Sequence, residues 1–126
     1  MLITLAACGG DDGNKATPDA AAPATDAATA TATVKTVTCP ATPAAMVMST
    51  ADNDTTFMPA STTVHVNDIV KFAMASTHNV APYTGMPTDP GLKVDFGATA
   101  CLQFTATGTF TFLCTAHGFH GTVIVQ

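Results

Sequence analysis

A cysteine and three histidines in this chain lie at spacings that suit a metal ion. Cys114, His117 and His120 follow one another closely, and His78 stands upstream after another apolar segment. A cysteine thiolate and two imidazoles together favour copper, whose potential is tuned by a long, weak axial contact. The sequence therefore predicts one mononuclear copper ion held by His78, Cys114 and His117, with His120 as a further candidate ligand.

The residues before Cys114 indicate how this side chain is positioned. Phe110, Phe112 and Cys114 alternate with polar or smaller residues, so they share one apolar face of an extended segment. Because successive side chains of a strand point to opposite faces, we expect Cys114 to point into the core. His78 follows the alternating segment 69–74, so it could reach the same end of the fold.

Short alternating segments recur from residue 46 onward, separated by turn residues such as those at 67–68 and 107–108. They are rich in β-branched and aromatic residues, a pattern typical of strands in a sandwich or barrel. We find no helical periodicity and predict an all-β fold, an antiparallel Greek-key β-sandwich or barrel with a long loop over residues 81–98. The expected strands lie at 46–48, 62–66, 69–74, 101–106, 109–114 and 121–125.

The first 36 residues have a different composition from the rest. Residues 5–8, Leu-Ala-Ala-Cys, resemble a bacterial lipobox, which makes Cys8 a candidate for lipidation and residues 1–8 a signal and lipobox remnant. The apolar run is short for a signal peptide and lacks a positive n-region, so we expect the natural start to lie upstream or the chain to have been trimmed. Residues 9–36, mostly Ala, Thr, Pro, Asp and Gly, lack apolar side chains for a core and predict a disordered tether.

The folded domain is expected to cover residues 37–126, with five aspartates against two lysines. This mildly acidic balance provides no basic surface for nucleic acid. It suits a protein, expected to be a monomer, that meets its partners briefly. We expect a cell-envelope location on the periplasmic or extracellular side, with membrane attachment only through the N-terminal lipid. Gly9 after Cys8 favours the outer membrane by analogy with Gram-negative sorting.

Three segments together resemble the cupredoxin family of blue copper proteins, plastocyanin and amicyanin especially. They are Phe57-Met-Pro59 followed by the alternating residues 64–72, then His78-Asn79-Val80, then Cys114-x-x-His117 before Gly121-x-Val123. The resemblance spans most of residues 46–125. It implies a copper protein that transfers single electrons to transient redox partners, with Asn79 bracing the loop that carries the ligands.

One position departs from the family pattern. Amicyanin-like loops have Met three residues after the second histidine ligand, where this chain has His120. We predict His120 as an unusual axial ligand. It could instead point to solvent, or bind copper in only one oxidation state. Met86 is a weaker candidate for approaching the metal than for forming an apolar rim, and His65 is expected at the surface.

The two remaining cysteines form an even pair once Cys8 is assigned to lipid and Cys114 to metal. We therefore predict a disulfide between Cys39 and Cys101, as expected for an oxidising compartment. Two other functions stay open: an envelope copper carrier or buffer with the same ligands, and a structural zinc site of one cysteine and three histidines. We expect no enzymatic activity, because paired carboxylates, a nucleophile motif and a second metal motif are all missing from the sequence.

Overall fold

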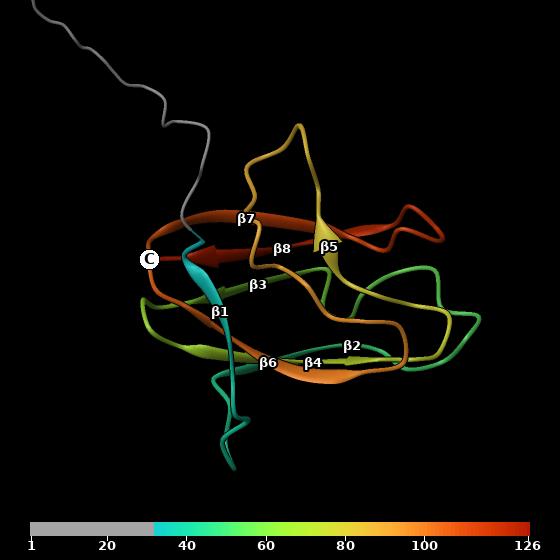
Figure 1. Cartoon of the computed structure of the whole chain (residues 1–126), viewed down its shortest axis with the longest axis horizontal. Coiled ribbons are helices and arrows are strands. Elements are labelled where there is room, and N and C mark those ends of the chain that lie inside the picture. The colour runs from blue at the N-terminus through green and yellow to red at the C-terminus, as the bar shows by residue number, and fades with distance from the viewer. Residues whose placement is uncertain (1–31) are drawn as a thin grey trace, which may run out of the picture. The chain divides into compact units, whose positions relative to one another are not determined.

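The computed structural model describes residues 32–126, and these form an all-β sandwich (Figure 1). One sheet has the strand order β1–β6–β4–β2 and the other β3–β8–β7–β5. The strands are β1 (Val34–Val37), β2 (Ala45–Ser49), β3 (Ser61–Val64), β4 (Ile69–Met74), β5 (Ala81–Pro82), β6 (Thr99–Phe104), β7 (Gly108–Leu113) and β8 (His120–Val125). Among the described residues, no helix is long and apolar enough to cross a membrane.

The core forms where the alternating side chains of the two sheets meet. Along β4, Val70, Phe72 and Met74 are buried while the residues between them are partly exposed. Phe112 on β7 packs edge-to-face against Phe72 and against Phe57, with ring centroids 5.4 and 4.9 Å apart. Period-2 alternation thus predicts both the strands and the core face.

The predicted all-β sandwich is confirmed, but two strand pairs run parallel, whereas the sequence predicted antiparallel pairing. β2 pairs with β4 and β3 with β8 in parallel, whereas the other pairs are antiparallel. Alternation along one strand predicts which side chains point inward, but it does not predict which strand lies beside it. The direction of strand pairing therefore cannot be predicted from alternation alone. The expected loop at 81–98 also contains the short strand β5, and Val80 bridges Val94.

The predicted domain start at residue 37 is too late, because β1 begins at Val34. Val34 is buried, and it pairs with Phe104 at the edge of its sheet. The buried carboxylate of Asp89 accepts bonds from the backbone N–H of Thr33 at 2.8 Å and from that of Val34 at 3.3 Å. Only Val34 is buried in this strand and Val37 is partly exposed, because an edge strand buries little. The lipobox cysteine Cys8 and the predicted tether up to residue 31 lie outside the described residues.

The predicted disulfide is confirmed. Cys39 and Cys101 are bonded across a sequence separation of 62 residues. Cys101 lies on β6, so the bond fixes the segment after β1 to the adjacent strand. In the chain-entropy model, a closed loop of this length contributes about 4 kcal/mol to stability.

Candidate metal centre

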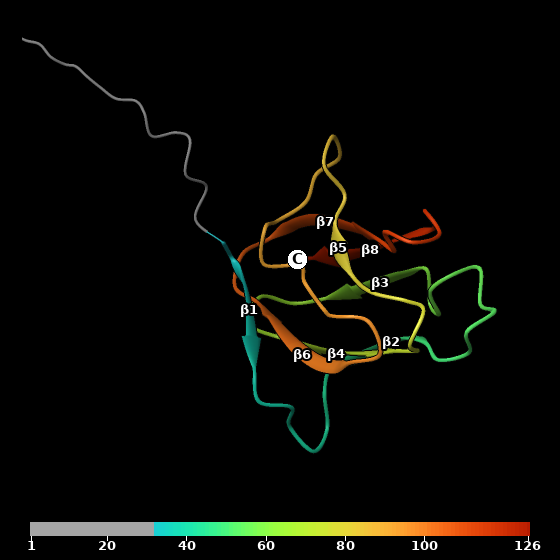
Figure 2. The same cartoon turned by 45° about the vertical axis from the view of Figure 1, so that its right-hand side comes forward.

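Three of the predicted ligands meet at one end of the sandwich. His78 lies in the segment between β4 and β5, and Cys114 and His117 lie between β7 and β8. These connections gather at the right-hand end in Figure 1 and remain together after the rotation in Figure 2. The Sγ atom of Cys114 is 3.8 Å from Nδ1 of His78 and 3.6 Å from Nδ1 of His117.

These separations fit a single bound ion. Sulfur and nitrogen donors that bind one ion at about 2.3 and 2.0 Å lie about 3.5–3.7 Å apart in tetrahedral or trigonal geometry, close to the separations observed here. The donor atoms of all three side chains lie within 4.8 Å of one another. The cluster therefore has the dimensions of a site for one transition-metal ion.

The three ligands differ in their access to solvent. Cys114 and His78 are fully buried, whereas His117 is exposed. Cys114 is buried because it continues the inward face of β7 set by Phe110 and Phe112, as the alternation predicts. The metal position thus has a dry inner side and one imidazole that reaches the surface.

A loop that the sequence analysis did not single out holds the ring of His78. Nε2 of His78 lies 2.9 Å from the carbonyl oxygen of Ala51. If Nε2 carries the proton and donates to this carbonyl, Nδ1 is free for the metal. The Ala51 N–H donates to Oδ2 of Asp54 at 3.0 Å, and the hydroxyl of Ser76 donates to Oδ1 of Asp52 at 3.0 Å. Asp54 therefore closes loop 50–56 on itself beside Ala51, and Asp52 ties the loop to the segment that leads to His78.

Asn79 ties the two ligand-bearing segments together, as the resemblance implies. Its Oδ1 accepts the backbone N–H of Thr115 at 2.9 Å and the Thr115 hydroxyl at 3.2 Å. The loop after β7 is also closed on itself, because the Cys114 N–H donates to the Phe119 carbonyl and the Gly118 N–H donates to the Cys114 carbonyl. Gly118 has φ 81°, a left-handed conformation that glycine adopts without strain.

Phe119 packs against both histidine ligands. Its ring centroid lies 5.2 Å from that of His78 and 6.0 Å from that of His117, with the latter pair stacked at 13°. Phe119 also contacts the buried ring of Phe57, at 4.8 Å between centroids. Phe119 therefore holds both imidazole rings against the apolar core.

The electrostatics of the cluster favour a thiolate. Burial alone raises the pKa of Cys114, but the backbone N–H of Asn79 and the imidazoles of His78 and His117 more than offset this and lower it to about 6. Burial also opposes the charged form of His78, yet the contacts with Cys114 and with the Ala51 carbonyl raise its pKa. The thiolate is the form that binds metal, so the sulfur is largely prepared at neutral pH.

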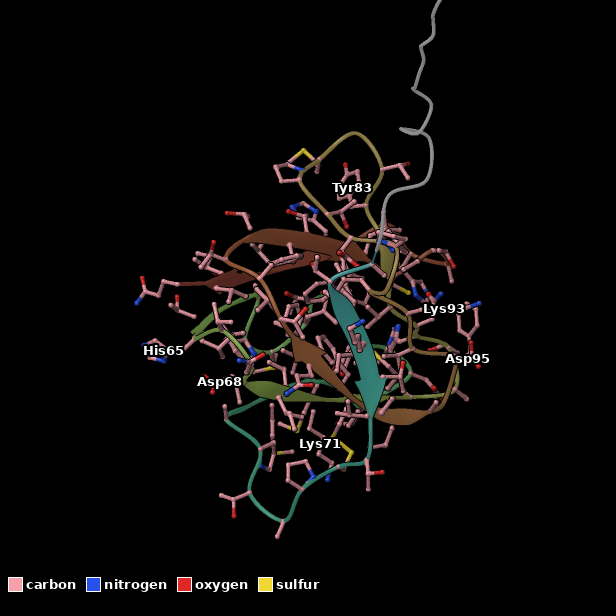
Figure 3. All side chains as sticks on the ribbon, turned by 60° about the vertical axis from the view of Figure 1, so that its left-hand side comes forward. His65, Asp68, Lys71, Tyr83, Lys93 and Asp95 are labelled. Carbon is pink, nitrogen blue, oxygen red and sulfur yellow. A yellow bond between two sulfur atoms is a disulfide. The ribbon has the colours of Figure 1, made fainter. Side chains whose placement is uncertain are left out.

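His120 is not brought into this cluster. It is the first residue of β8, where it pairs with Leu113, and its exposed ring lies 5.5 Å from that of Tyr83. Val123 and Val125 point inward on the same strand, so His120 falls on the outer face. His65 is exposed as expected, with Nδ1 3.7 Å from Asp68 (Figure 3). Met86 is exposed in the loop after β5.

A scan against protein-family models finds no match, and a search of curated proteins finds none either. Solved structures of amicyanin are similar in fold. Amicyanin from Paracoccus versutus (Thiobacillus versutus) matches with 18% identity and a TM-score of 0.59, over 76% of this chain and 100% of that one. A reduced Cu(I) amicyanin variant at pH 4 matches with 23% identity and a TM-score of 0.57, over 75% and 99% of the chains. An oxidised variant matches with 24% identity and a TM-score of 0.58, over the same shares.

The fold and the cluster agree with each other. The eight strands in two mixed sheets have the arrangement of the amicyanin structures, and the cluster of one cysteine and two histidines lies at the end of that sandwich. The described part of the chain therefore has a cupredoxin-like fold.

Proposed function

We propose that this protein binds one copper ion through His78, Cys114 and His117 and carries single electrons. The observation that carries this proposal is the spacing of the three donor atoms, which suits one ion with a buried thiolate. Copper bound there would supply the one-electron redox change. A thiolate and two imidazoles that the protein holds in place suit both Cu(I) and Cu(II), because the ligands need to move little when the oxidation state changes.

The protein's own residues support this role in three ways. Asn79 and the Ala51 carbonyl fix the ligand segments, Phe119 holds both imidazoles, and burial keeps water from Cys114. Residues that orient a metal ligand through a hydrogen bond contribute to the site as well, since their mutation typically costs about 10–100-fold in metal affinity. The exposed ring of His117 offers a path for electrons to a partner that docks briefly, with a small interface as redox encounters have.

We place the protein outside the cytoplasm, on the periplasmic or extracellular side of the cell envelope. The support is the disulfide between Cys39 and Cys101, because such bonds persist in oxidising compartments. Anchoring through a lipid on Cys8 and an outer-membrane address remain predictions from the sequence. Metabolic labelling with a fatty acid, in the natural host and with Cys8→Ser as control, tests the anchor.

Protein-film voltammetry of the copper-loaded protein tests the electron-transfer role. We expect a reversible one-electron wave that persists over repeated cycles, since the site keeps its ligands in both states. Loss of copper on the first reduction would contradict electron transfer.

A copper carrier is the second candidate. Two observations favour it: His120 lies outside the cluster, and His117 is open to solvent. A carrier should release Cu(I) to a competing chelator within seconds, whereas an electron carrier should hold it. A structural zinc site would show zinc retained after purification and no redox wave.

A further inference from the structure

Three exposed methionines gather on the outer face of one sheet edge. Met46, Met48 and Met58 expose 41%, 39% and 61% of their surface. Methionine is usually buried as an apolar residue, so three exposed side chains in one place call for an explanation. Their side chains lie exposed on β2 and on its bridge partner Met58, whereas His78 and Cys114 of the metal cluster are buried.

The strand register places these side chains together. Met46 and Met48 are two residues apart on β2, and the residues between and after them, Val47 and Ser49, are buried. Met46 and Met48 therefore share the outer face, with Cα atoms about 7 Å apart. This follows from the period of a strand and from the burial pattern itself.

Met58 lies directly opposite Met48. The two residues form an antiparallel bridge in which each N–H donates to the other's carbonyl, at 2.9 and 2.8 Å. Residues paired in this way have Cα atoms about 5.5 Å apart and side chains on the same face. Since methionine has three rotatable bonds, all three sulfur atoms can converge on one point above β2.

The neighbouring strand β4 leaves room beside Met48 and places a positive charge beside Met46. Across from Met48 on β4 is Ala73, whose small side chain leaves space, and across from Met46 is Lys71. Figure 3 shows Lys71 on the side of its sheet that faces away from the other sheet. The ammonium of Lys71 opposes a cation, while its flexible stem allows it to swing into solvent.

We propose that Met46, Met48 and Met58 form a surface site for a soft monovalent cation, Cu(I) in particular. Thioether sulfur is a soft donor that favours Cu(I) over hard ions. Three neutral thioethers carry no proton to displace, so binding should not depend on pH near neutrality. The site is separate from the buried cluster and uses different donor atoms, so it stands or falls independently of the proposed electron transfer.

Methyl NMR of the protein labelled at methionine Cε tests the site, with Ag(I) as a redox-inert probe for Cu(I). The titration is made on the copper-loaded protein and on Cys114→Ser, in which the competing buried thiolate is absent. We expect the methyl signals of Met46, Met48 and Met58 to shift together and saturate at one equivalent. Met86, exposed in a loop elsewhere, and buried Met74 serve as internal controls and should not move.

Substitutions sharpen the test. Met48→Leu, which keeps the volume, should weaken Ag(I) binding about tenfold or more, since even loss of an outer partner costs a metal site that much. Met86→Leu is the matched control and should change nothing. Lys71→Met, which removes the charge and adds a thioether next to Met46, should tighten binding. Zn(II) should shift none of these methyl signals.

Two outcomes would overturn the proposal. One is that Met86 shifts in parallel with the three, which would mean that each thioether binds silver alone. The other is that no methyl signal saturates in either protein. If Cys114→Ser does not fold, the copper-loaded protein decides the question by itself.

Discussion

Nε2 of His78 lies 2.9 Å from the carbonyl oxygen of Ala51, so a backbone group on a loop between the two sheets orients a buried imidazole. The loop is held in turn by Asp54, which accepts the Ala51 N–H at 3.0 Å and lies 3.5 Å from the Ser49 hydroxyl. Asp54 thus positions His78 indirectly, through Ala51, although Asp54 itself is not one of the metal-binding side chains.

Asp54→Ala should weaken copper binding by about 10–100-fold, the range typical for residues that orient a ligand. The Ala51 carbonyl would lose its fixed position, and Nδ1 of His78 would spend less time facing Cys114. Competition with a chelator of known affinity measures the change. Asp54→Asn keeps a side-chain oxygen for the Ala51 N–H and should retain most of the affinity, whereas Asp95→Ala removes an exposed acid elsewhere and should have no effect. Equal losses in Asp54→Ala and Asp95→Ala would show that charge alone matters.

His120→Ala should leave the visible absorption of the copper protein unchanged. The ring of His120 lies against Tyr83 on the outer face of β8 and is not part of the cluster. His117→Ala is the positive control and should change or abolish the spectrum, because it removes a donor. A shifted band in His120→Ala would show that His120 turns inward and binds when copper is present.

Asp89→Asn should destabilise the protein by about 2–3 kcal/mol at neutral pH, since hydrogen bonds to a buried charged group are among the strong ones. Asp89 accepts from Thr33 and from the N–H groups of Val34 and Gly91, and so fixes the start of β1. A Cβ at Gly91 would collide with the Val34 carbonyl, so this segment packs closely. Urea unfolding of the metal-free protein measures the loss.

The effect of Asp89 should depend on pH in one direction. Burial alone raises the pKa of its carboxyl, but the bonds from Thr33, Gly91 and Val34 outweigh this and hold it below 3.8. A depressed folded-state pKa gives stability that is fully present above 3.8 and is lost as the pH falls through the folded-state value. The difference between the protein and Asp89→Asn should therefore be constant from about pH 5 to pH 7 and shrink in acid. A difference that grows as the pH falls would refute this account.

Much of the fold follows from local sequence. Val70, Phe72 and Met74 on β4, and Phe110, Phe112 and Cys114 around β7, are buried as their alternation predicts. The ligand cluster could be predicted as well, because Cys114 and His117 are close in sequence and His78 follows a recognisable strand. These signals are side-chain patterns within single segments.

What the sequence did not reveal depends on contacts between segments. Ala51 orients His78 through its backbone carbonyl, and because every residue has such a carbonyl, the residue type does not predict this role. β1 was missed because an edge strand with one buried residue has too little alternation to stand out. The orientation of His120, in contrast, could have been predicted from the sequence. Val125 and Val123 point inward, so alternation along β8 places residue 121 on the inner face and His120 on the outer face. The prediction of His120 as a ligand rested instead on its spacing after Cys114 and His117 and on its place in a family pattern.

The visible absorption and EPR spectra of the protein with one equivalent of Cu(II), beside those of Cys114→Ser, test the central claim most directly. We expect an intense thiolate-to-copper band in the protein and none in Cys114→Ser, because only the Cys114 sulfur can supply it at this cluster. Circular dichroism of Cys114→Ser confirms that the sandwich remains folded. A protein that binds Cu(II) without such a band, or that keeps zinc in its place, would contradict a copper centre formed by His78, Cys114 and His117.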